Sequence, residues 1–327
     1  MAKLKLTLAL DRYDRHFPFF DETVQVPENI ELEALQVGQS QSWRDGGRRH
    51  EQMYHDRAFD VCEFGLSPYV MLRERNPELP LIALPVFPRR LFSQSQIFVG
   101  ASSGITCPED LKGCRVALRS FHTTLSVLVK GDLKFHYGVP WEEIIWCTSK
   151  AEMVDYTAKS GIQVDALPEG MTLEQAIDTG HVDAIVVPHP PPGVSAGTLS
   201  ARRLFRDCVM EEKRYFRDRG AFPIMHLMVM RSDLLAREPW LGETIMNLFA
   251  QAKEISEGYL DDPNWSRLAW GRHDLEFEND ALGDPWPIGF KANRSNLAQF
   301  IDYATDQNLI SGLIKPEDLF AERLLDS

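Results

Sequence analysis

Two polar side chains stand in apolar stretches of the sequence, and both can transfer protons. His226 lies inside the apolar run 223–228, and an imidazole is the side chain that titrates nearest to neutral pH. Glu63 ends the apolar segment 59–63, where burial would let its carboxyl act as a general acid or base. Each also has an ordinary interpretation, as a hydrogen-bonded core histidine and as a solvated charge at a strand end. We keep both as candidate catalytic residues.

His189 is a third candidate for proton transfer. It follows the apolar run 184–187 and lies in the proline-rich segment 188–193. In open α/β sheets, the loops at the carboxyl ends of the strands line the ligand site. The alternative interpretation is a turn residue without a chemical role.

Several segments have the composition of an anion site. Residues 119–124 join a predicted strand to a predicted helix, whose first N–H groups favour a carboxylate or phosphate. The alternative is that the hydroxyls of this segment only cap the helix. An arginine at the end of a strand can hold a carboxylate with two parallel hydrogen bonds. The alternative interpretation of such an arginine is an exposed surface charge. The turn after the first predicted strand offers further candidate binding residues. The alternative interpretation is a solvated turn without a binding role. The candidate substrate-binding residues from these segments are Tyr13, Arg15, Arg90, His122, Thr123 and Thr124.

The sequence lacks the common metal and cofactor motifs. It contains no HExxH or HxH pattern, and its 5 cysteines form no CxxC pair. It also lacks GxGxxG and the P-loop pattern. We therefore expect no metal ion, no nucleotide and no disulfide framework.

Composition narrows the class of protein further. The 327 residues are 44% hydrophobic and 25% charged, which is typical of a globular chain of about two domains. The net charge of -13 argues against nucleic acid or an anionic membrane as the partner. The most apolar runs, 79–86 and 184–187, are far shorter than the roughly 20 residues of a membrane-spanning helix. The N-terminus lacks the long apolar stretch of a secretory signal, so we expect a cytoplasmic protein.

The candidate residues must be positioned by an alternation of strands and helices, which predicts layered α/β architecture. The predicted strands are 4–10, 59–63, 81–86, 96–99, 115–118, 144–147, 182–187 and 222–230. The predicted helices are 48–57, 67–75, 124–137, 173–179, 241–259 and 295–307, with Ser67 and Ser295 near two of their starts as candidate caps.

This order of elements predicts two lobes. The first lobe comprises residues 1–98 and 222–327, and the second, residues 99–221, is inserted into it. Strand ends and helix starts of both lobes would point into a cleft between them. The residues expected to line this cleft are Tyr13, Arg15, Glu63, Arg90, Thr123, Thr124, His189 and His226.

An ordered set of short segments resembles a known family over nearly the whole chain. The segments are 13–15, 59–69, 82–92, 108–113, 222–226, 238–240, 292–294 and 316–320. In this order they resemble the 4,5-dihydroxyphthalate decarboxylases, enzymes with the type 2 periplasmic-binding-protein fold. The sequence differs from the family pattern at 120–124 and at 93–95, where Ser95 stands at a candidate substrate-binding position.

The resemblance implies a carboxy-lyase of aromatic catabolism, as in phthalate degradation. Its reaction would be the cofactor-independent decarboxylation of a hydroxylated aromatic acid, 4,5-dihydroxyphthalate or a close relative. Such a reaction needs a proton donor, a base for the phenol and cations for the remaining carboxylate. His226, Glu63, Arg90 and the Thr123–Thr124 helix start are the expected sources of these groups. The expected partner is a small aromatic carboxylate, and a homo-oligomer is compatible with this interpretation.

A solute-binding protein of a transporter, recognising an aromatic or other small carboxylate, is the alternative function. The same fold serves both purposes, because fold alone does not determine function. An uptake receptor needs export or a lipid anchor, and the N-terminal sequence shows no signal for either.

Overall fold

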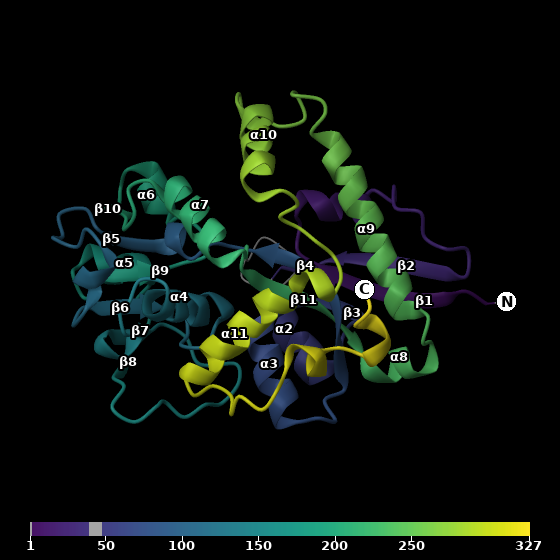
Figure 1. Ribbon diagram of the computed structural model, residues 1–327, viewed down its shortest axis with the longest axis horizontal. Coiled ribbons are helices and arrows are strands. Elements are labelled where there is room, and N and C mark those ends of the chain that lie inside the picture. The colour runs from purple at the N-terminus through teal and green to yellow at the C-terminus, as the bar shows by residue number, and fades with distance from the viewer. Residues whose placement is uncertain (1, 39–47) are drawn as a thin grey trace.

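Two β-sheets lie side by side along the long axis of the computed structural model, which describes residues 2–38 and 48–327 (Figure 1). In spatial order, the described strands of the first sheet are β2 (Ile30–Gln36), β1 (Leu4–Leu10), β3 (Val61–Gly65), β11 (Ile224–Arg231) and β4 (Leu81–Arg90). Those of the second sheet are β10 (Ala201–Arg203), β5 (Ile97–Gly100), β9 (Ala184–Val186), β6 (Arg115–Leu118), β7 (Ile145–Thr148) and β8 (Val164–Ala166). The predicted α/β class with two sheets is confirmed.

The chain crosses from one sheet to the other twice, and the first strand after each crossing is antiparallel to its neighbours. β5 pairs antiparallel with β9 and β10, and β11 pairs antiparallel with β3 and β4. The other strand pairs, such as β1 with β3 and β6 with β9, are parallel. The chain therefore leaves the first sheet after β4 and returns to it at β11. The predicted lobe boundaries at 98/99 and 221/222 stay a prediction.

Helices cover both sheets. Around the first sheet lie α1 (Phe17–Phe20), α2 (Arg49–Glu51), α3 (Leu66–Arg75), α8 (Ser232–Arg237) and α9 (Leu241–Tyr259). Around the second lie α4 (Thr124–Phe135), α5 (Leu173–Asp178), α6 (Pro192–Ala196) and α7 (Cys208–Arg219). The chain ends with α10 (Gly271–Leu282) and α11 (Arg294–Asp306), and α11 packs on α4 (Figure 1). None of the helices in these described ranges is both long and apolar enough to cross a membrane.

Some elements differ from the sequence prediction. The strands β2, β8 and β10 and the charged helix α7 were not predicted, because they are short, half-buried or weakly periodic. Ser67 lies inside α3, which Gly65 precedes at the cap position, and its N–H donates to the Thr124 hydroxyl instead. α11 begins at Arg294, so Ser295 lies inside that helix rather than at its cap.

A buried carboxyl group joins the segments that connect the two sheets. Asp132 of α4 accepts hydrogen bonds from Ser93 (2.6 Å), which follows β4, and from Tyr215 (2.9 Å) of α7. It also accepts one from Tyr303 (3.0 Å) of α11. The ring of Tyr303 packs so closely on α4 that a Cβ at Gly131 would lie 2.0 Å from it. Segments from both crossings and from the C-terminus thus meet at one side chain.

We expect the stability of this junction to depend on pH through Asp132. Burial raises the pKa of Asp132 to about 6, against the opposing effect of its three hydroxyl donors. The folded protein therefore takes up a proton that the unfolded chain, with a pKa near 4, does not hold. Lowering the pH from 7 to 5 should increase the free energy of unfolding by about 1.4 kcal/mol through this group. Denaturant unfolding of the wild type and of Asp132→Asn at both pH values measures the difference.

The asparagine variant is the control, because it keeps a hydrogen-bonding side chain of the same shape without the titration. All other titrating groups act equally in both proteins and cancel. Equal pH dependence of the two proteins would contradict the assignment.

Candidate active site

Glu63 lies at the centre of the first sheet, on a strand that is buried along its whole length. Its side chain is 0% exposed, and four groups surround its two oxygens. Oε1 accepts from the Tyr13 hydroxyl at 3.2 Å and lies 2.5 Å from His226 Nδ1. Oε2 accepts from the Asp11 N–H at 3.1 Å and lies 3.2 Å from Arg49 Nη2. A buried carboxylate thus has partners for both oxygens, as it must to avoid the free-energy cost of desolvation.

His226 reaches Glu63 because of the strand register. β11 places His226 opposite Gly65 of β3, while Met228 lies opposite Glu63. Residues two positions apart in a strand share a face, so His226 is a diagonal neighbour of Glu63. The pairing of β11 with β4 is irregular on both sides of His226. We call this unit the Glu63–His226 pair.

The protonation states of the pair follow from its surroundings. Burial alone would raise the pKa of Glu63, but Arg49 and His226 hold it well below its usual range. Burial lowers the pKa of His226 to about 4, although Glu63 acts in the opposite direction. At neutral pH, Glu63 is therefore ionised and His226 neutral. A neutral imidazole beside a carboxylate donates from Nδ1, which leaves Nε2 as the basic nitrogen.

Two more ionisable side chains complete the buried cluster. His50 of α2 presents its ring to His226 at 5.1 Å between centroids and 80° between planes. Burial, then the charges of His226 and Arg49, lower the pKa of His50. Burial raises the pKa of Tyr13 to about 12, so its hydroxyl stays protonated and donates to Glu63.

Contacts between the two sheets lie beside the cluster. The Ser67 N–H donates to the Thr124 hydroxyl at 3.1 Å, which links the start of α3 to the start of α4. Arg89 Nη2 lies 3.5 Å from His189 Nε2, which links β4 to the turn after β9. Thr124 is buried and His189 is exposed. The structure thus places both predicted residues at the junction of the sheets, near the Glu63–His226 pair rather than within it.

Arg15 lies at the edge of the cluster. Its Nε donates to the Pro88 carbonyl at 3.0 Å, and its guanidinium lies 3.9 Å from the Trp286 ring centroid and 4.5 Å from that of Tyr13. These contacts fix the guanidinium against aromatic rings. The substrate-binding role expected of Arg15 stays a prediction.

Arg90 lies apart from the cluster, contrary to its expected role. Its guanidinium is buried and donates to the Phe222 carbonyl at 2.8 Å and to the Asn293 side chain. Neighbouring residues of a strand point to opposite faces, and Arg89 is the one whose charge acts on His226. Arg90 therefore ties β4 to the returning and C-terminal segments, and Arg89 replaces it as the candidate for an anion.

The candidate residue Ser95 also has structural partners. Its N–H donates to Glu212 at 3.1 Å, its carbonyl accepts from Arg203 at 3.1 Å, and its hydroxyl accepts from Gln96 at 2.6 Å. These contacts fasten the first crossing to α7 and β10. In the structure, the described contacts of Ser95 therefore serve the packing of this crossing.

His122 and Thr123 hold the start of α4 in place. His122 Nε2 lies 2.7 Å from the Val154 carbonyl and 3.1 Å from Glu152, and the ring is buried. The Thr123 hydroxyl accepts from the Ser126 N–H at 3.2 Å, so it caps the helix. Of the two interpretations of this segment, the capping one describes Thr123, and the N–H groups of Phe121 and His122 donate to the Glu152 carboxylate.

Arg49, His50, Asp11 and Arg89 belong to the site but were not among the predicted site residues. Arg49 and His50 lie in a short helix whose placement over β3 depends on the fold. The nearest signal was the pair Arg89–Arg90 after a proline, which could not show which arginine faces the site. Among the described residues, no group of three or more His, Cys, Asp and Glu side chains is arranged to hold a metal ion.

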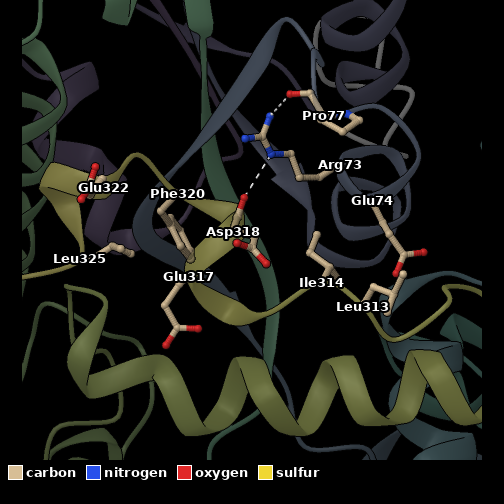
Figure 2. Close-up of a pocket in the computed structure, with 10 residues that line it drawn as sticks. All are labelled: Arg73, Glu74, Pro77, Leu313, Ile314, Glu317, Asp318, Phe320, Glu322 and Leu325. Atoms are coloured by element: carbon tan, nitrogen blue, oxygen red, sulfur yellow. Dashed lines mark hydrogen bonds between the residues drawn. The ribbon is translucent and has the colours of Figure 1, made fainter.

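A large groove of about 560 Å³ lies elsewhere, between the end of α3 and the C-terminal segment (Figure 2). Its walls include Glu74, Leu313 and Glu317, and Arg73 donates to the Asp318 carbonyl at 3.1 Å. The predicted site residues do not line it. We therefore place the candidate active site at the Glu63–His226 pair on chemical grounds.

Comparison with known proteins bears on this assignment. No protein-family model matches the chain. A 4,5-dihydroxyphthalate decarboxylase of Comamonas testosteroni is 28% identical over 341 residues, covering 100% of this chain and 99% of the relative. The chain is a full-length homologue of 4,5-dihydroxyphthalate decarboxylase. A second 4,5-dihydroxyphthalate decarboxylase, from Pseudomonas putida, is 29% identical over 213 residues, covering 63% of this chain and 79% of the relative. The resemblance predicted from the ordered segments is confirmed.

Solved structures show the fold of this decarboxylase homologue. The periplasmic aliphatic sulphonate binding protein SsuA from Escherichia coli matches with a TM-score of 0.58 and 12% identity, covering 98% of this chain and 92% of that one. The desulfurization enzyme DSZB matches with a TM-score of 0.53 and 15% identity, covering 99% and 98%. The predicted type 2 periplasmic-binding-protein-like fold is confirmed. Because the fold occurs in a binding protein and in an enzyme, it does not choose between the two functions.

Proposed function

We propose that the protein is a cofactor-independent carboxy-lyase that decarboxylates a hydroxylated aromatic acid, with 4,5-dihydroxyphthalate as its substrate. The observation that carries the proposal is the buried Glu63–His226 pair, in which the imidazole lies 2.5 Å from an ionised carboxylate. A carboxylate that orients a histidine is a recurrent arrangement for proton transfer. The full-length homology to 4,5-dihydroxyphthalate decarboxylase supports the class of reaction.

The reaction exchanges one proton for one carbon dioxide. Each carboxylate of 4,5-dihydroxyphthalate has a hydroxyl para to it. As that hydroxyl loses its proton, its electrons enter the ring, and a proton adds to the carbon that carries the carboxylate. The bond to the carboxylate then breaks, its electron pair restores the aromatic ring, and carbon dioxide leaves. The phenol regains its proton, so the net change is uptake of one proton and release of carbon dioxide.

His226 is the group that we assign to deliver this proton. It is neutral in the substrate-free protein because burial lowers its pKa to about 4. A bound dicarboxylate brings negative charge next to the ring, which favours its protonated form. Glu63 stabilises the imidazolium that results. The proton is then available at Nε2 while Nδ1 remains bonded to Glu63.

Arginines from both sheets are our candidates for holding the carboxylates. Arg89 of β4 acts electrostatically on His226 and Tyr13, and Arg119, which follows β6, acts on His50. An arginine–carboxylate contact is charge-assisted and directional. A substrate with two adjacent carboxylates could bridge these side chains, with the ring carbon beside His226.

The purified protein should release carbon dioxide from 4,5-dihydroxyphthalate and form 3,4-dihydroxybenzoate. Phthalate is the control, because it has both carboxylates but no hydroxyl to supply electrons to the ring. Parallel reactions with a chelator test for a metal requirement. Tight binding of 4,5-dihydroxyphthalate without carbon dioxide release would contradict the enzyme and favour the solute-binding function.

A further inference from the structure

Arg49 holds two parts of the candidate site at once. Its side chain is 0% exposed, and its Nε donates to the Glu63 carbonyl at 2.9 Å. Nη2 lies 3.2 Å from Glu63 Oε2, and Nη1 donates to the Val37 carbonyl and lies 3.9 Å from Asp11 Oδ2. One guanidinium therefore contacts both the backbone and the carboxylate of Glu63, on the carboxylate oxygen that His226 leaves free.

The charges explain what this contact does. With Arg49 present, an ionised Glu63 and a neutral His226 give the buried group no net charge. Without that positive charge, the buried Glu63 carboxylate would lose the cation that contacts it, which is strongly unfavourable. The pair would then bind a proton, and the imidazole is the more basic of its two members.

We infer that Arg49 is a positioning residue whose charge keeps Glu63 ionised and His226 unprotonated until a substrate binds. This inference rests on the proposed function for its catalytic meaning. Arg49 acts through Glu63 and does not itself contact the reacting carbon. The pair would otherwise hold its proton between turnovers.

Other ionisable groups face the Glu63–His226 pair and set the background for this effect. They are Asp11, Tyr13, Arg15 and His16 from the segment after β1, His50 from α2, Cys62 from β3, Arg89 from β4 and Arg119 from the second sheet. Burial lowers the pKa of His16 to about 3, so this ring adds no charge. Arg49 is distinguished from the other arginines by its 3.2 Å contact with the carboxylate.

A titration of His226 in the substrate-free protein tests the inference. The ring nitrogens are followed by nitrogen-15 NMR, and His226→Gln identifies their signals. In the wild type, His226 should stay neutral down to about pH 4. Arg49→Met should raise its titration midpoint by at least about one pH unit, because an opposite charge at this distance is lost. With substrate, the same variant should lower kcat more than it changes KM.

Matched variants separate charge from packing. Arg49→Lys keeps the charge, so His226 should titrate close to its wild-type midpoint. If Arg49→Met does not fold, Arg49→Gln takes its place, because it removes the charge but keeps hydrogen-bond donors. Arg90→Met removes a buried arginine from outside the cluster and should leave the midpoint unchanged. An unchanged midpoint in both uncharged Arg49 variants would overturn the inference. Because the titration needs no substrate, a wild type that releases no carbon dioxide would refute the proposed function separately.

Discussion

Replacement of His226 by glutamine is expected to slow decarboxylation at least about 100-fold while leaving a folded protein that binds the aromatic acid. A positioned general acid–base group typically contributes about 10²–10⁴-fold to the rate. Glutamine retains an N–H donor for Glu63, whose Oε1 lies 2.5 Å from the imidazole in the wild type, so the carboxylate keeps a partner. Turnover is measured by release of carbon dioxide, and binding by calorimetry with phthalate as the unreactive analogue.

His181→Gln is the matched control for this experiment. His181 lies at the opposite end of the second sheet from the crossings, where its carbonyl accepts from Arg115 at 3.2 Å. Its replacement should leave turnover within a few-fold of the wild type. Undiminished turnover in a His226→Gln protein with a normal circular dichroism spectrum would return His226 to the interpretation of a structural core histidine. His189 would then be the next candidate for the proton donor.

The meeting of Glu63 and His226 was predictable in part. Both residues break an apolar pattern, and a buried polar side chain needs a partner to offset its desolvation. The sequence therefore indicates that each residue has a partner or a function. It does not say that they are partners of each other, because that depends on the antiparallel register of β11 against β3. Register is a property of the assembled sheet and of its irregular pairing with β4.

The structure makes Arg89, and not the predicted Arg90, the arginine that faces the cluster. The predicted strand ended at residue 86, whereas β4 continues to Arg90. Side chains alternate between faces along a strand, so the end of the strand decides which arginine faces the cluster. The strand propensity of the residues cannot predict where β4 ends, because the strand continues beyond its apolar run. Buried partners such as Asn293, which lies far along the sequence, complete the assignment.

Arg49 and His50 could not be found from sequence patterns. They belong to a helical segment that runs through a π-helical turn, Gln52–Asp56, before β3. Their polar character is ordinary for a surface helix, and the sequence predicts only that residues 48–57 form a helix. Only the placement of this helix over the end of β3 buries them. A buried charge shifts the pKa of a neighbouring group more strongly than an exposed one does.

Replacement of Glu63 by glutamine is expected to have the largest effect on stability in this protein. The carboxylate accepts from Asp11, Tyr13 and His226 and pairs with Arg49, and all of these groups are partly or fully buried. Removing one partner of a buried ion pair costs about 3–5 kcal/mol, because the remaining buried charge loses its nearest opposite charge. Turnover should also fall by at least about 100-fold, because the imidazolium of His226 loses the charge that stabilises it. Denaturant unfolding measures the first effect and carbon dioxide release the second.

A double-mutant cycle with Arg49→Met separates the ion pair from general damage to the core. The double variant lacks both charges of the Glu63–Arg49 ion pair, so it should be more stable than the sum of the two single losses implies, by at least about 1 kcal/mol. Its turnover should stay low, because stability is restored without the carboxylate that serves His226. Additive losses of stability would show that Glu63 and Arg49 contribute independently, in spite of the 3.2 Å between their charged atoms. A Glu63→Gln protein with full turnover would mean that His226 needs no negative partner to accept its proton.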